Sequence, residues 1–133
     1  MNSNTKLFKK EYALELFRIA ENDLETGKVL ATATKVRRET VLFNLEQAVE
    51  KSLKAVLCHY EKPIPFTHDI YAILLLFDQN NLPPGGYALH DLTPFASIRR
   101  YEEGKFIITV DDIQNALNLV EKVLNWAKLE LNK

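Results

Sequence analysis

Two arginines followed by a tyrosine are the residues of this chain best suited to hold an anion. Arg99, Arg100 and Tyr101 are consecutive and stand between a predicted helix and a predicted loop. Two guanidinium groups can grip a phosphate through paired hydrogen bonds, and the neighbouring ring can stack on a base. The same arginines could instead pair with Glu102, Glu103 or an acidic residue of another helix, and the sequence leaves both roles open.

Two further groups of polar side chains could take part in ligand binding. Gln47, Lys51 and Lys54 recur at spacings of three and four, so they form a polar stripe along a predicted helix. His68 stands at the start of the next predicted helix. Its ring could contact a ligand there, or it could fix the loop by hydrogen-bonding Asp69 or a backbone carbonyl.

The sequence offers no metal-binding or nucleophilic pattern. His59 and His90 have no partner at metal-ligand spacing, and the chain has only one cysteine, so we expect neither a metal ion nor a cofactor. That residue, Cys58, belongs to an apolar helix and is expected to be a small core residue. No Ser-His-Asp order and no phosphate-binding glycine loop is present.

Length and composition predict one ordinary globular domain over residues 1–133, with residues 1–6 as a frayed tail. The chain has a net charge of -1, 47% hydrophobic residues and 26% charged residues. Such a charge gives no overall attraction to nucleic acid, so any RNA contact must come from a local patch. The longest apolar run, between Ala72 and Phe77, is far shorter than the roughly 20 residues of a membrane span. With no signal sequence and a single cysteine, we expect a soluble, cytoplasmic protein.

The central element is a predicted helix from about Arg38 to Tyr60. It contains no Gly or Pro, and apolar residues recur along it at spacings of three and four. Small residues, Ala48, Ser52 and Ala55, form a second stripe that would let another helix approach closely. We expect Glu50 to form a surface pair with Lys54, four residues later. The apolar face comprises Leu42, Leu45, Val49, Leu53, Val56 and Tyr60.

The flanking segments predict an all-α, up-down helical bundle of about five helices, three long and two short. A long helix is expected from Leu7 to about Leu30, with Leu14 and Ile19 among its apolar residues, and another from about Val110 to Leu131, capped by Thr109 and Asp112. A short helix should follow Thr67 as its N-cap. A fourth is expected from about Tyr87 to Ile98, before an extended segment over Lys105–Val110. The long helices carry apolar residues on more than one side, which predicts a homodimer.

Three blocks of sequence, taken in order, resemble a HEPN domain. They are Gln47-Ala48-x-Glu50-Lys51-x-x-Lys54-Ala55, then Pro65-x-Thr67-His68-Asp69-Ile70, then Arg99-Arg100-Tyr101, within a likeness that runs from about Glu11 to Leu131. HEPN domains are small helical domains associated with nucleotide binding. In them the helix corresponding to the central one lines a groove used for dimerisation and ligand contact. The resemblance therefore implies a ligand-binding role for Gln47, Lys51 and Lys54.

One departure from the family bears on activity. The ribonuclease members of the HEPN superfamily carry Arg, four to six intervening residues, then His. No arginine of this chain has a histidine at that distance. The chain is therefore more similar to the minimal HEPN proteins encoded beside a small nucleotidyltransferase, where the HEPN chain binds substrate or regulates its partner.

Three functions follow as alternatives. The first is a non-catalytic, homodimeric module that binds a nucleotide or RNA, or a nucleotidyltransferase partner. Such a module and its partner could form a toxin–antitoxin pair. The second is a metal-independent ribonuclease toxin that would use His68 with Arg99 or Arg100. The third is a dimeric helical adaptor without a ligand. The residues expected to form the site of the first are Gln47, Lys51, Lys54, His68, Arg99, Arg100 and Tyr101.

Overall fold

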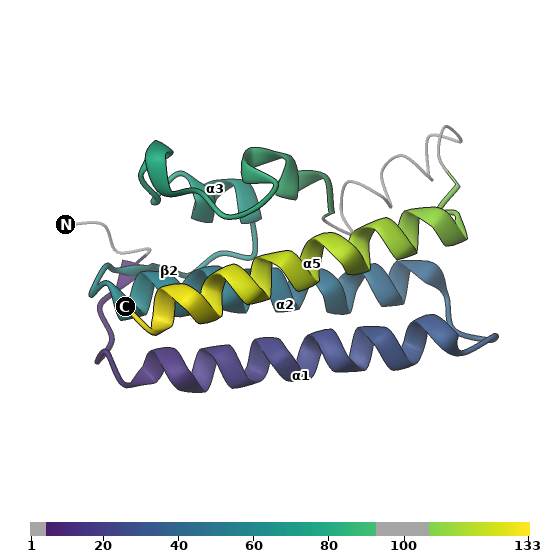
Figure 1. The fold of residues 1–133 in the computed structure, drawn as a ribbon, viewed down its shortest axis with the longest axis horizontal. Helices are drawn as coiled ribbons and strands as arrows, with labels where there is room; N and C mark the ends of the chain where they lie inside the picture. The colour runs from purple at the N-terminus through teal and green to yellow at the C-terminus, as the bar shows by residue number, and fades with distance from the viewer. Residues whose placement is uncertain (1–4, 93–106) are drawn as a thin grey trace.

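Three long helices packed side by side form the body of the molecule (Figure 1). The computed structural model describes residues 5–92 and 107–133. The long helices are α1 (Tyr12–Thr32), α2 (Arg38–His59) and α5 (Val110–Leu131). Helix α2 packs against both α1 and α5, and the short elements between α2 and α5 form a layer on one side of the bundle. The predicted all-α class is confirmed.

The short elements of the described residues include one α-helix, two 3-10 helices and a small antiparallel sheet. They are α3 (Ile70–Leu74), η1 (Gln79–Asn81), η2 (Gly86–Leu92), β1 (Thr5–Lys6) and β2 (Ile64–Pro65). Helix α3 is capped by Asp69, whose Oδ1 accepts a hydrogen bond from the amide of Tyr71 at 3.0 Å, so the prediction of Thr67 as its N-cap was wrong. The part of the predicted fourth helix that the structure describes is the 3-10 helix η2, and the rest lies outside the described residues.

Helix α2 is the centre of the core, as its sequence predicts. Leu45, Val49 and Leu53 are fully buried, and the small residues that form the second stripe are buried with them. Tyr60, expected on the same face, lies just beyond the helix and is exposed, because the chain turns away there. Cys58 is buried, as predicted, and its thiol donates a hydrogen bond to the carbonyl of Lys9 at 3.2 Å.

Helix α1 differs from its prediction in its start and in its buried face. It begins at Tyr12, and Leu14 and Ile19 are exposed. The buried face combines the larger residues Leu16, Phe17 and Leu24 with Ala13, Ala20 and Gly27, which recur every seven residues. A Cβ atom at Gly27 would lie 2.8 Å from Cδ2 of Leu45. Small side chains therefore let α1 approach α2 closely at this point.

The chain before α1 is tied to the loop that follows α2. Thr5 pairs with Pro65, and Lys6 pairs with Ile64. Thr5 and Lys6, expected to belong to a frayed tail, thus form strand β1 instead, and the rest of the expected tail, residues 1–4, lies outside the described residues. The pairing holds β2 in place, directly before the segment that carries His68.

Helix α5 has the predicted bounds and the predicted cap. The amide of Asp112 donates to Oγ1 of Thr109 at 3.0 Å, and the amide of Thr109 donates to Oδ2 of Asp112 at 2.8 Å. The extended segment expected before α5 is described only from Ile107 onward, where no regular structure is formed. Within residues 5–92 and 107–133, no helix has both the length and the hydrophobicity that crossing a membrane would require.

Candidate functional site

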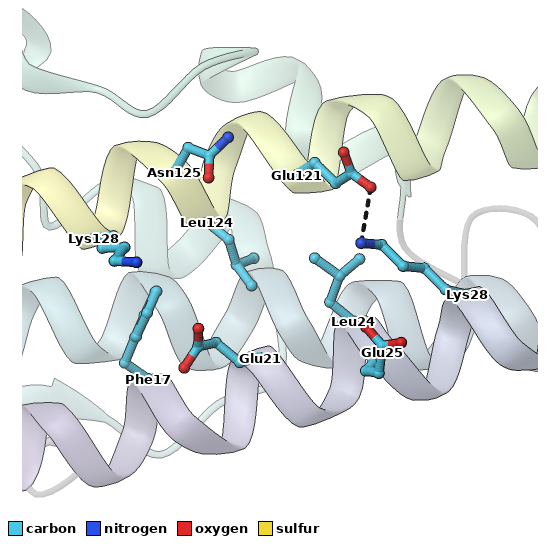
Figure 2. A pocket seen from close by; sticks show the side chains of 9 residues that line it. All are labelled: Phe17, Glu21, Leu24, Glu25, Lys28, Glu121, Leu124, Asn125 and Lys128. Carbon is cyan, nitrogen blue, oxygen red and sulfur yellow. Dashed lines mark ion pairs between the residues drawn. The ribbon is translucent and has the colours of Figure 1, made fainter.

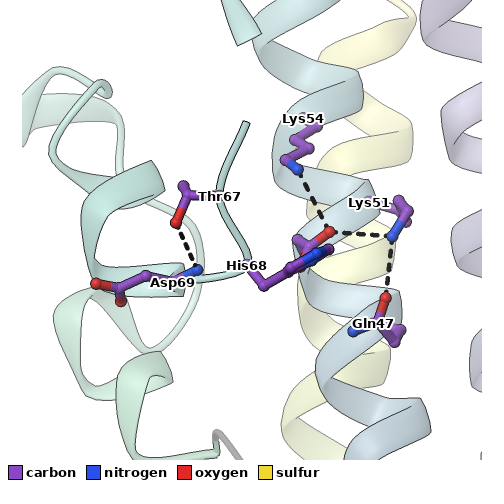
Figure 3. A network of polar contacts seen from close by, with 7 residues as sticks. Gln47, Lys51, Lys54, Thr67, His68 and Asp69 are labelled. Carbon is purple, nitrogen blue, oxygen red and sulfur yellow. Dashed lines mark hydrogen bonds and ion pairs between the residues drawn. The ribbon is translucent and has the colours of Figure 1, made fainter. Parts of the chain in front are cut away.

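A buried carboxylate on α2 gathers cationic and polar side chains from two parts of the chain. The Glu50 side chain is fully buried. Its Oε2 accepts hydrogen bonds from Nζ of Lys51 at 3.0 Å and Nζ of Lys54 at 3.4 Å, and its Oε1 lies 2.8 Å from Nδ1 of His68. Figure 3 shows the His68 ring pointing from its loop toward α2, where these side chains meet. We call this group, with Gln47, the Glu50 network.

Gln47 joins the network through Lys51. The Lys51 ammonium donates to Oε1 of Gln47 at 3.0 Å as well as to Glu50. An ammonium has three N–H donors, so the described contacts use two on Lys51 and one on Lys54. The lysine side chains remain 22% and 12% exposed, respectively. The remaining donors can therefore serve a ligand at the surface of α2.

The loop after α2 brings His68 to the network. Pro63 and Pro65 prevent α2 from continuing, because proline has no amide hydrogen and restricts the residue before it. The amide of Asp69 donates to Oγ1 of Thr67 at 3.1 Å, which shapes the turn around His68. The His68 side chain is 82% exposed although its Nδ1 contacts Glu50. The ring thus presents Nε2 to solvent, next to the two lysines.

The proton equilibrium of Glu50 reflects its partners. Burial alone would raise the pKa of Glu50, but hydrogen bonds from Lys51 and His68 and the charge of Lys54 hold it below the ordinary value. Glu50 is therefore ionised at neutral pH and holds the two ammonium groups and the imidazole in fixed positions.

Two further carboxyl groups lie near the network, and their pKa values are raised, whereas that of Glu50 is lowered. Burial, reinforced by the negative charges of Glu50 and Asp69, raises the pKa of Glu46 to about 7. Burial also raises the pKa of Asp23 on α1, an effect that the charge of Lys51 opposes. Helix α1 therefore contributes an acidic side chain to the surroundings of the network, and Glu46 exchanges its proton near neutral pH.

The sequence did not identify these carboxylates as part of the site. Glu50 was expected in a surface pair with Lys54; the pair is present, but the carboxylate is buried. A signal was available, because a glutamate on a helix that is apolar on two sides has little surface left to occupy. Glu46 and Asp23 gave no such signal, since their burial depends on how α1 and the His68 loop pack.

The predicted site residues divide into two groups. The structure brings together Gln47, Lys51, Lys54 and His68 around Glu50. The predicted Arg99-Arg100-Tyr101 group lies outside the described residues. Among the side chains that the structure does describe, no cluster of three or more His, Cys, Asp or Glu could hold a metal ion.

A second polar groove, between α1 and α5, was not predicted from the sequence (Figure 2). It has a volume of about 280 Å³, and its lining includes Phe17, Leu24 and Leu124. Lys28 and Glu121 form an ion pair across it at 3.0 Å. The charges of Lys28 and Glu121 neutralise each other, and both side chains are partly exposed. Their positions are therefore less fixed than those of the cations in the Glu50 network, and this groove is a weaker candidate.

Comparison with known families agrees with the helical architecture. Residues 13–131 match the HEPN domain. No curated protein and no solved structure matches the chain. The match covers α1, α2, the His68 loop and α5, and hence every described part of the site. The chain belongs to the HEPN domain family.

Proposed function

We propose that this HEPN domain is a non-catalytic binding module for the phosphate-bearing part of a nucleotide, either free or within RNA. The observation that carries the proposal is the convergence of Lys51, Lys54 and His68 on one buried carboxylate. The three groups are held before a ligand arrives, so binding does not have to order them. Charge-assisted hydrogen bonds from such groups to phosphate oxygens are strong.

In this proposal Glu50 positions the donors instead of competing for the ligand. Its carboxylate is buried, whereas 22% of the Lys51 side chain and 12% of the Lys54 side chain remain exposed. A phosphate can therefore approach the unused N–H donors from outside. The contacts of Arg99, Arg100 and Tyr101 with a phosphate and a base stay a prediction from their residue types, because these residues lie outside the described part of the chain.

The test is an equilibrium titration of the full chain with ADP, ATP and a short 5′-phosphorylated RNA. Lys51→Gln and Lys54→Gln should each weaken binding by about tenfold, the equivalent of about 1.4 kcal/mol. Lys28→Gln is the matched control, because it removes the same charge from the α1–α5 groove, and its affinity should stay within twofold. Equal affinities for all four proteins would contradict the proposal.

We further propose that the binding module acts with a small nucleotidyltransferase, as its substrate-binding or regulatory subunit. The two proteins could together form a toxin–antitoxin pair. Two facts support this partner: the chain belongs to the HEPN family, and its sequence resembles the minimal members encoded beside a nucleotidyltransferase. The direct test is to co-express the chain with the product of the neighbouring reading frame and to ask whether the two elute together from a sizing column. A neighbour of unrelated type, or separate elution at micromolar concentration, would contradict the pairing.

One observation favours a second function, a metal-independent ribonuclease. With Glu50 ionised, Nδ1 of His68 donates to it, and the exposed Nε2 of a neutral ring carries a lone pair that could accept a proton from a ribose hydroxyl. Incubation of the protein with RNA in the presence of EDTA separates the two functions. The binding module predicts intact RNA, whereas cleavage that His68→Ala abolishes would establish the ribonuclease.

A further inference from the structure

Phe43 is an exposed aromatic residue on the same strip of α2 as the Glu50 network. Its side chain belongs to a residue that is 52% exposed, whereas the other large apolar residues of α2 are buried. Phe43 precedes Gln47 by four residues and Lys54 by eleven, spacings that place all three on one line along the helix. Exposure of one ring is common and carries nothing alone. Its alignment with a preorganised set of cations is what requires explanation.

The cations lie closer to Phe43 than the sequence positions of the lysines suggest. Nζ of Lys54 reaches back to Glu50, and Nζ of Lys51 reaches back to Gln47. Both positive charges therefore lie one to two turns beyond Phe43, about 6–10 Å along the axis. This separation suits a nucleotide, in which a sugar stands between the base and the first phosphates.

Gln47 occupies the interval between the ring and the cations. Its Oε1 accepts from Lys51, and within the described part of the chain no contact uses the two N–H donors of its amide group, so they can serve a ligand. The strip thus runs from an aromatic surface through neutral hydrogen-bond donors to ammonium groups. Base, sugar and phosphate present matching chemistry in the same order.

We propose that Phe43 is the base-stacking platform of the site, so that a nucleotide lies along α2 with its phosphates at Lys51 and Lys54. This inference rests on the proposed function and adds the orientation of the nucleotide and the residue that contacts its base. Stacking tolerates any base, because each has a π face. The site therefore selects nucleotides over phosphate compounds that lack a base, without strong preference among bases.

The experiment compares ADP with inorganic pyrophosphate, which offers the phosphates without a base. Both are titrated into the wild type, Phe43→Ala and Phe43→Trp by calorimetry, with Leu14→Ala as the control for an exposed apolar residue on α1. Phe43→Ala should weaken ADP binding by about tenfold, whereas its affinity for pyrophosphate should stay within twofold of the wild-type value. Phe43→Trp should restore the affinity for ADP, and Leu14→Ala should change neither ligand.

The outcomes separate this inference from the function on which it rests. If the wild type binds neither ligand, both are overturned. If the wild type binds both but Phe43→Ala changes neither affinity, only the platform is overturned. If Phe43→Ala weakens both ligands equally and turns a dimer into a monomer on a sizing column, the ring is a contact between two copies of the chain, and the platform is again overturned.

Discussion

Replacing Glu46 with glutamine should make the protein more stable at high pH and leave it nearly unchanged at low pH. Glu46 lies on α2 one turn before Glu50, is almost completely buried, and has a pKa raised from 4.5 to about 7. The folded protein therefore keeps this proton at pH values where the unfolded chain has lost it. The stability that the neutral carboxyl provides is fully present below about pH 4.5 and is lost as the pH rises through 7.

The size of the effect follows from the shift in the pKa. Each pKa unit corresponds to about 1.4 kcal/mol, so ionising Glu46 in the folded state costs about 3 kcal/mol by pH 8. Glutamine has nearly the same shape and no charge to bury. The free energy of unfolding of Glu46→Gln should therefore be higher than that of the wild type by up to about 3 kcal/mol at pH 8 and by less than about 1 kcal/mol at pH 5.

The assay is urea unfolding of both proteins at several pH values between 5 and 9, with the free energy of unfolding taken from each curve. Glu25→Gln serves as the control, because it makes the same substitution at an exposed position of α1, and its free energy of unfolding should stay within about 0.5 kcal/mol of the wild-type value. A Glu46→Gln difference that does not change with pH would refute the reasoning, since it would mean that Glu46 ionises as readily in the folded protein as in the unfolded chain.

Three further predictions concern the network, the core and the assembly. Glu50→Gln should lower the free energy of unfolding by about 1.5–3 kcal/mol at pH 7, because charged hydrogen bonds are lost, and by less as the pH falls through the lowered pKa of Glu50; urea curves at pH 7 and pH 3 measure this. Leu53→Ala should cost about 2–5 kcal/mol in the same assay, because Leu53 is fully buried, and a loss below 1 kcal/mol would show that its site collapses without a cavity. The chain should be a homodimer, since apolar residues such as Ile19 and Val29 remain exposed on α1, and light scattering that gives a monomer at tens of micromolar would rule this out.

Helices α2 and α5 could be predicted to within a residue because local signals define both. Neither contains Gly or Pro, and α5 starts at a capping box formed by Thr109 and Asp112. Helix α1 could not be placed as well, because apolar residues occur on all its sides and because the close approach of Gly27 to Leu45 involves a second helix. A contact between two helices cannot be deduced from the periodicity of one.

The site was only partly predictable, because some of its residues share one helix while others meet through contacts between distant segments. Gln47, Lys51 and Lys54 belong to one helix, so their common stripe follows from spacing alone. The burial of Glu50 and its contact with His68 depend on a loop that returns to α2 eighteen residues later. The path of that loop depends in turn on the pairing of β1 with β2, which no local pattern in the sequence indicated.

The measurement that tests the central claim most directly is a nuclear magnetic resonance titration of the labelled protein with ADP, followed through its backbone amides. We predict that the amide signals that shift first belong to residues 43–54 on α2 and 67–69 in the His68 loop. The amide signals of residues along the α1–α5 groove, around Lys28 and Lys128, should not shift, and they serve as the internal control. Shifts concentrated in that groove, or no shifts at millimolar ADP, would contradict the assignment of the Glu50 network as the nucleotide site.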